Sequence, residues 1–156
     1  MDLGSQLQKY RQEHDETLRF LKACESALDL AESQQDAERR RGLADLREME
    51  KKFERIRQHC NEEEQNVESA YRLYLEDAAL QRLSEEHGLL VRWNNDFCRE
   101  LRFATIARTD EVVALGRQFL EVLRHHVVFE EGLLKQIQDE KEAEEKLLLK
   151  YTQGAE

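Results

Sequence analysis

The sequence predicts an all-α protein in which four long helices form two hairpins. Its 156 residues include no proline and only six glycines, so few positions favour a turn. Charged residues make up 37% of the chain, and apolar residues recur among them at intervals of three and four. This spacing gathers apolar side chains on one face of a helix, and we expect no strands.

The ends of the predicted helices follow from capping residues and polar stretches. Ser5 and Gln8 have capping-box spacing, so the first helix is expected to begin near Ser5. Thr109 is a favourable N-cap for the last helix. The charged stretch 139–156 is expected to continue that helix in solvent, either as a docking arm or as a solubilising segment. The predicted helices of this single domain, 1–156, cover about 5–32, 36–74, 78–104 and 110–150.

Charge and hydropathy exclude several classes of partner. The formal net charge of −10 repels phosphate backbones and anionic lipids, so we expect neither a nucleic-acid partner nor a membrane partner. No apolar run approaches the ~20 residues that cross a bilayer, and no signal peptide is visible, which favours a cytoplasmic protein. Cys24, Cys60 and Cys98 have the spacing of neither a zinc site nor a redox pair, and we expect them to be packed thiols.

A pattern of histidine and glutamate on the apolar stripes occurs twice in the chain. Each copy has a lone histidine and, some 40 residues later, a second histidine four places before a glutamate. The copies are His14 with His59 and Glu63, and His87 with His126 and Glu130. A buried carboxylate without a partner costs several kcal/mol, so each glutamate requires a cation, an arginine or a proton. A metal ion satisfies both glutamates at once, and the pattern therefore predicts a metal site.

The helix lengths predict that the histidines of each hairpin lie at the same level. His14 and His59 are about 21 and 24 residues from the expected turn near Gln35, at ~1.5 Å per residue. The two histidines of the second hairpin are about 21 and 18 residues from the turn near Arg108. Each hairpin should therefore place its two histidines side by side.

The connection between the hairpins is the least determined part of the prediction. No glycine or proline interrupts the helical pattern after His59, and a break at 75–77 leaves the two legs unequal by about 10 Å. Either the turn lies earlier, close to Tyr71 and Leu73, or the two helices continue as one rod. In the second case two chains would exchange hairpins and form a homodimer.

The two copies share further residues that carry a family resemblance. A Glu-His pair ends the stretches from Leu7 to His14 and from Leu80 to His87, and the later segments read His-x-x-x-Glu-Glu from His59 and from His126. Over most of its length the chain resembles the hemerythrin-like, or HHE cation-binding, domains. That resemblance implies an up-down-up-down four-helix bundle around a non-haem di-iron centre.

The resemblance also implies a role for each candidate ligand. Terminal ligands would be His14, His59, His87 and His126, and the bridging carboxylates would be Glu63 and Glu130. The iron ions would be bridged by these carboxylates or by an oxo group, although imidazole and carboxylate also suit manganese and zinc.

One departure from the family pattern favours reactivity over simple oxygen carriage. Oxygen-carrying hemerythrins have a second histidine one turn after the first on the third helix, where this chain has Val91. Open coordination positions favour handling or sensing of O2, NO or peroxide, or storage and donation of iron. The sequence leaves open whether the protein is an enzyme. The alternative function is that of a metal-free acidic helical bundle or coiled coil that binds other proteins.

Two neighbouring histidines leave the register of the last helix open. His125 and His126 point about 100° apart around the helix, so only one of them can face the interior. His126 is preferred because Glu130 follows it by four residues. The alternative register pairs His125 with Glu130. Tyr71, Tyr74 and Trp93 could gate a di-iron centre or relay electrons near it, but core packing is the expected role.

Overall fold

The structure, a computed structural model, describes residues 2–153, apart from the side chains of residues 67–70 and 153. This part of the chain consists of α-helices, two short 3₁₀ helices and the turns between them. The α-helices are α1 (Leu3–Ala31), α2 (Asp36–Glu48), α3 (Glu50–Ala70), α4 (Asp77–Phe103) and α5 (Thr109–Gln153). The 3₁₀ helices are η1 (Tyr71–Leu73) and η2 (Ile106–Arg108). The all-helical prediction is therefore confirmed, and no strand occurs within residues 2–153.

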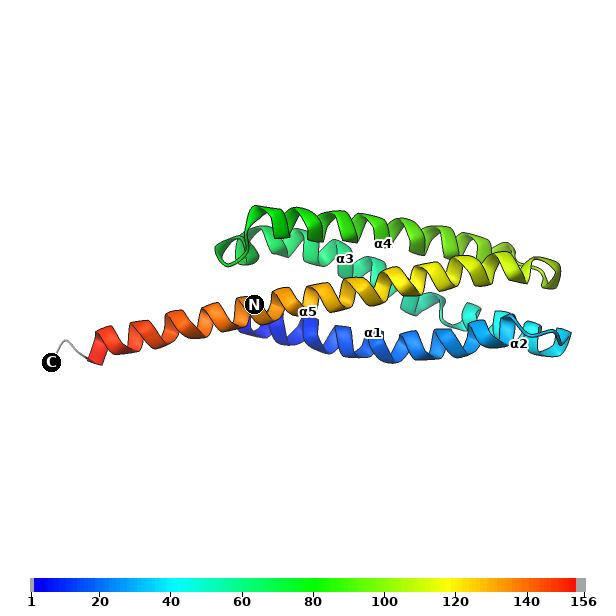
Figure 1. The fold of residues 1–156 in the computed structure, drawn as a ribbon, viewed down its shortest axis with the longest axis horizontal. Helices are drawn as coiled ribbons and strands as arrows, with labels where there is room; N and C mark the ends of the chain where they lie inside the picture. Colours follow the sequence, from blue (N-terminus) through cyan, green and yellow to red (C-terminus); the bar gives the residue numbers. More distant parts are fainter. Residues whose placement is uncertain (1, 154–156) are drawn as a thin grey trace.

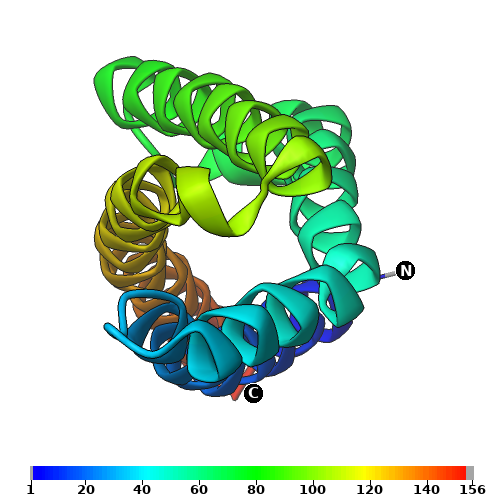
Figure 2. The same ribbon diagram turned by 90° about the vertical axis from the view of Figure 1, so that its right-hand side faces the viewer.

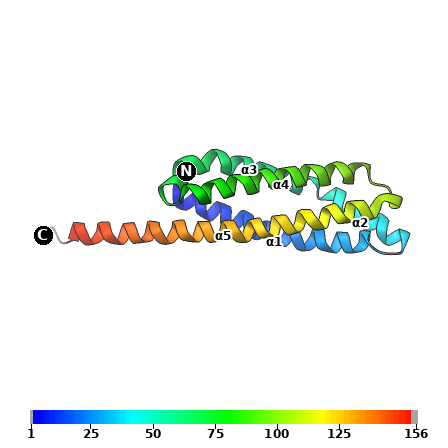
Figure 3. The same ribbon diagram turned by 45° about the horizontal axis from the view of Figure 1, so that its top comes forward.

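The helices lie side by side along a common long axis (Figure 1). Helix α1 packs against α2 and α5, and α4 packs against α3 and α5. Viewed along the axis, the helices surround a shared interior (Figure 2). The C-terminal part of α5 extends beyond the other helices (Figure 3). Within the described residues, no helix is both long enough and apolar enough to span a membrane.

The buried apolar side chains form two clusters along this axis. One cluster is centred on the rings of Phe53, Phe97 and Phe119, whose centroids are 5.2 to 6.0 Å apart. The other contains Tyr10 and Tyr71 with leucines from α1, α4 and α5. In the sequence, His14, Glu63, His87 and Glu130 each lie between residues of one cluster and residues of the other, and His59 and His126 each directly precede the last residue of the first cluster on their helix. The apolar interior is thus divided by a polar layer.

The helix ends differ from the predicted ones for identifiable reasons. Helix α1 begins before Ser5, because the Asp2 carboxylate accepts hydrogen bonds from the Ser5 amide at 2.9 Å and from its hydroxyl at 3.0 Å. Thr109 is the first residue of α5 and does not cap it. Its hydroxyl donates instead to the Ile106 carbonyl of η2 at 2.8 Å.

The predicted helix over 36–74 is divided at Met49. Gly42 lies directly against α1, where a Cβ would be 2.4 Å from the Ala31 nitrogen and 2.6 Å from the Ala27 oxygen. Only glycine allows this approach of the two backbones. Helix α3 has little contact with α1 and packs against α4 instead. The chain changes direction at Met49, whose amide bonds to the Leu46 carbonyl at 3.1 Å.

The connection between the hairpins is the earlier of the two predicted turns. Helix α3 ends at Ala70, and η1 follows at Tyr71–Leu73 before α4 begins at Asp77. The Tyr71 carbonyl accepts the amides of Tyr74 and Leu75 at 2.9 and 2.8 Å, which closes the turn. The legs to His59 and His87 are then nearly equal. One chain brings the two hairpins together without exchange between molecules.

The predicted C-terminal extension is helical and almost entirely exposed. Helix α5 continues to Gln153, and residues 154–156 of the predicted stretch lie outside the described residues. Its apolar side chains near the end are solvent-exposed, among them Leu147, Leu148, Leu149 and Tyr151.

Candidate metal centre

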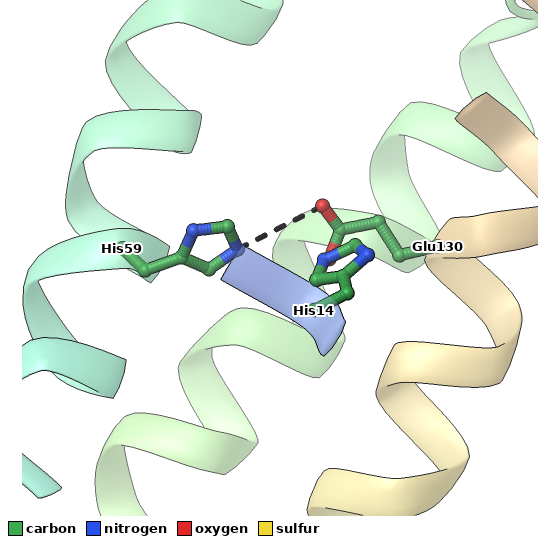
Figure 4. Close-up of side chains that lie close together, drawn as sticks. All are labelled: His14, His59 and Glu130. Atoms are coloured by element: carbon green, nitrogen blue, oxygen red, sulfur yellow. Dashed lines mark ion pairs between the residues drawn. The ribbon is translucent and has the colours of Figure 1, made fainter. Parts of the chain in front are cut away.

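All six predicted ligands lie in the polar layer that separates the two apolar clusters. The contributing helices are α1 with His14, α3 with His59 and Glu63, α4 with His87, and α5 with His126 and Glu130. Five of these residues are at most 3% exposed, and the His59 side chain is 16% exposed. Figure 4 shows His14, His59 and Glu130 pointing toward one another from three helices. The structure therefore brings the six side chains together.

The His-x-x-x-Glu spacing places one imidazole and one carboxylate on the same helix face. Residues four apart lie one turn apart in an α-helix. The Nε2 atom of His59 is 3.2 Å from Oε2 of Glu63, and Nε2 of His126 is 2.8 Å from Oε2 of Glu130. In both copies the pair faces the interior.

Each carboxylate also reaches histidines of the other copy. Oε2 of Glu130 is 3.2 Å from Nε2 of His14, and its Oε1 is 3.8 Å from Nε2 of His59. Oε2 of Glu63 is 3.4 Å from Nε2 of His87. The atoms that could hold an ion form two groups within 4.8 Å, each with two histidines, and Glu130 belongs to both groups.

A second set of carboxylates fixes the outer nitrogen of every imidazole. The Nδ1 pairs are His14 with Glu131 at 2.7 Å, His59 with Glu13 at 2.5 Å, His87 with Glu64 at 2.7 Å and His126 with Glu86 at 3.1 Å. A carboxylate only accepts hydrogen bonds, so each Nδ1 carries the proton and donates it. This tautomer leaves the inward Nε2 atoms able to bind a metal ion, as in histidines that ligate metals.

The outer carboxylates follow the internal repeat. Glu13 and Glu86 each precede the first histidine of a copy and bind the second histidine of the same copy. Glu64 and Glu131 each follow the inner glutamate and bind the first histidine of the other copy. These four residues have no role in the prediction from the sequence. Their signal was present in the Glu-His and Glu-Glu pairs that occur in both copies.

Seven buried polar atoms at the centre have no hydrogen-bond partner among the described residues. They are the Nε2 atoms of His14, His59, His87 and His126, Oε2 of Glu63, and both carboxylate oxygens of Glu130. The short Nε2 to carboxylate distances do not have hydrogen-bond geometry. An unsatisfied buried polar atom costs about 1–3 kcal/mol, so seven at one place require a common partner. Imidazole nitrogens and carboxylate oxygens are a donor set that fits divalent metal ions.

The charges at the centre favour binding of cations. Burial by itself lowers the pKa of His14, His59 and His87, but the adjacent glutamates outweigh burial and raise the pKa of all three. Burial raises the pKa of Glu130, and its neighbours Glu63 and the histidines overcome this and hold that pKa well below its ordinary value. Without a metal the cluster therefore retains protons, and a metal ion would have to displace them.

The two neighbouring histidines of α5 have opposite environments. His126 is 3% exposed and faces the carboxylate of Glu130. The side chain of His125 is 79% exposed, and its nearest acidic partner is Glu121 at 3.8 Å. The geometry thus favours the His126 register over the alternative with His125.

Tyr71 does more than fill the core. It is 1% exposed, as expected for a core residue, and its hydroxyl donates a hydrogen bond to Oε1 of Glu63 at 3.3 Å. This contact holds one carboxylate oxygen and leaves Oε2 facing the histidines. Tyr71 is therefore a positioning residue for Glu63.

The cysteines lie outside the ligand set. Cys24 and Cys60 are buried, and burial raises the pKa of each thiol to about 12. Burial also raises the pKa of Cys98 to about 11. All three remain protonated thiols at neutral pH, which suits packing and not nucleophilic chemistry.

No family model, curated protein or solved structure matches this chain significantly.

Proposed function

We propose that the chain is a dinuclear metal-binding protein with a hemerythrin-like, up-down-up-down four-helix bundle. In this arrangement α2 and α3 together form one bent helix, and α1, α4 and α5 are the other three. The resemblance in the sequence and the order of helix contacts support the proposal.

One observation carries the metal site: seven buried polar atoms without hydrogen-bond partners among the described residues converge at one level of the bundle. At this level a carboxylate binds the outer Nδ1 atom of each of the four imidazoles. A buried cluster of this kind is unfavourable for a protein that binds no ion, since its polar atoms are desolvated and lack hydrogen-bond partners. Two divalent ions would satisfy the imidazole nitrogens and the carboxylate oxygens together.

In this proposal the ligands divide between two ions. The first would take His14 and His59, and the second would take His87 and His126. Glu130 belongs to both groups, and Oε2 of Glu63 lies 3.2 Å from His59 and 3.4 Å from His87, so both carboxylates are in position to bridge. Each ion would then have two imidazole and two carboxylate ligands, and an octahedral ion keeps further positions for an outside ligand.

Iron is the metal we propose, because of the family resemblance, although manganese and zinc suit the same ligands. A pair of iron ions supplies binding and reduction of O2, NO or peroxide, and it also serves for storage or donation of iron. The chain supplies the rest of the site. The outer glutamates orient the imidazoles, Tyr71 orients Glu63, and the two apolar clusters limit access of water from the ends.

The test is metal analysis of protein prepared from iron-replete cells. About two irons per chain and near-ultraviolet absorption are expected. His126→Ala should lower the iron content, whereas His125→Ala, on the same helix but facing solvent, should leave it unchanged. A colourless, metal-free protein that is equally stable, or equal iron in the two variants, would overturn the proposal.

The alternative function is that of a metal-free module that binds other helical proteins. The exposed leucines near the end of α5 favour it, because they offer an apolar face beyond the helical core. The same metal analysis separates the two functions, since the module predicts no bound iron and no effect of His126→Ala.

A further inference from the structure

A cavity of about 700 Å³ lies beside the candidate metal centre and opens between α1 and α3. Its wall contains His14, His59 and His126. Deeper in, it is lined by buried apolar residues from all four long helices, namely Phe20, Ile56, Leu90, Leu123 and Val127. Protein interiors are close-packed, so a cavity of this size is not an ordinary packing defect.

The opening follows from the bend at Met49. Gly42 holds α2 against α1, whereas α3 leaves α1 and packs against α4. The two helices that border the cavity therefore diverge. The volume lies within the range of pockets for organic ligands and far exceeds the ~30 Å³ share of one water molecule, so a diatomic ligand alone does not account for it.

Three cationic side chains stand at the rim of the cavity: Arg19, Lys52 and Arg55. All three are exposed, and within residues 2–153 none forms an ion pair with a carboxylate. The Lys52 ammonium lies 5.7 Å from the centre of the Phe20 ring, at the boundary of the apolar lining. These cations are available to an anionic group from outside.

The carboxylates near the rim are already engaged. Glu62 is 3.1 Å from the Lys9 ammonium, and Glu13 binds both a histidine and Lys9. Glu16 accepts a hydrogen bond from the Gln12 amide at 3.3 Å. Glu13 and Glu62 are thus paired with Lys9, and Glu16 keeps its charge because the Gln12 amide is neutral. Arg19, Lys52 and Arg55 form no ion pair with these carboxylates and remain free to pair with an anion.

We propose that this cavity binds an amphipathic organic anion, a carboxylate with an unbranched apolar chain. The carboxylate lies at Arg19, Lys52 and Arg55, and the chain extends inward along the apolar wall toward the histidines. The position of the chain end beside reactive metal ions rests on the proposed function, whereas binding itself depends only on the cavity and its rim.

The test is calorimetric titration of the full chain with octanoate, with octan-1-ol and octylammonium as uncharged and oppositely charged probes. We expect saturable binding of octanoate and weaker binding of the other two. Ala23→Trp places a large side chain at the mouth and should abolish binding. Its control is Ala44→Trp, at an exposed position of α2 away from the cavity, which should bind octanoate normally.

A second pair of variants tests the charged rim. The double variant Arg19→Ala with Arg55→Ala should weaken octanoate binding about fivefold, a modest effect because exposed charge pairs are screened. Arg40→Ala with Arg41→Ala changes the net charge equally at exposed positions outside the cavity and should have no effect. Equal effects of the two double variants, or equal affinity for octanoate and octan-1-ol, would overturn the assignment of an anion.

The result can be separated from that of the metal proposal. Titrations are made on iron-loaded and on chelator-treated protein, and the metal content is measured independently. Octanoate binding to a chain that takes up no iron would leave the cavity inference standing and refute the metal centre. Iron binding without saturable octanoate binding, or normal binding by Ala23→Trp, would refute the cavity inference alone.

Discussion

Replacing Glu64 by alanine should weaken the binding of one of the two proposed metal ions and leave the binding of the other unchanged. The Glu64 carboxylate accepts the Nδ1 proton of His87 at 2.7 Å and touches no Nε2 atom. Loss of such an outer partner lowers metal affinity by about 10–100-fold. The Glu64 side chain is 41% exposed, so solvent screens this contact and we expect about tenfold, or ~1.4 kcal/mol. The affected ion is the one assigned to His87 and His126.

The internal repeat allows the corresponding experiment on the other proposed ion. Glu131 binds Nδ1 of His14 at the same 2.7 Å and with the same 41% exposure, so Glu131→Ala should weaken the other ion to a similar extent. The measurement is a stepwise titration of metal-free protein against a chromophoric chelator. Glu85→Ala is the control, since Glu85 accepts only a hydrogen bond from Gln81. If both ions weaken together in each single variant, or if the control behaves like Glu64→Ala, the assignment of outer partners is refuted.

Two further predictions concern stability. Gly42→Ala should destabilise the protein by about 3 kcal/mol in urea unfolding, because its Cβ would meet the α1 backbone. The control is Gly132→Ala, whose Cβ would have nothing within 4 Å and which should be neutral or stabilising. Equal losses of stability in the two variants would contradict the close approach of α2 and α1. The metal-free protein should be most stable between about pH 4.5 and pH 6.5, the ordinary values for Glu130 and His14. The raised pKa of His14 gives stabilisation that is lost as the pH rises above this window, and the lowered pKa of Glu130 gives stabilisation that is lost as the pH falls below it. A flat profile in unfolding experiments across pH 4 to 9 would refute this, and bound metal should remove the alkaline decline.

The sequence was sufficient to predict that the six inner residues lie together, because their positions depend on local spacing. His59 and Glu63 share a face through a four-residue interval, and equal helix lengths set the level of the histidines across each hairpin. These spacings stay the same even where the predicted helix ends are slightly wrong. The outer glutamates could have been found by the same reasoning, since they are adjacent to the inner residues in both copies.

The bend and the cavity could not be predicted in this way. The apolar periodicity continues through Met49 without a proline or a glycine at that position, so the local pattern favours one long helix. The cause of the bend is tertiary: Gly42 permits contact between two backbones. Similarly, the turn at Tyr71–Leu73 is closed by backbone hydrogen bonds and not by residues typical of turns. Only the packing of the other helices decides where each break lies.

The polar layer also governs how the molecule holds together over its length. In most helical proteins the middle of each helix is the most protected part, and the ends open first. Here the mid-helix turns that carry His14 and His87 contribute imidazoles to a site of buried polar atoms without hydrogen-bond partners, while apolar packing lies on either side. An ion bound there would cross-link the helices between the two apolar clusters. Without the ion, local unfolding would begin at the polar layer in the middle of the molecule, and the two apolar clusters would open independently of each other.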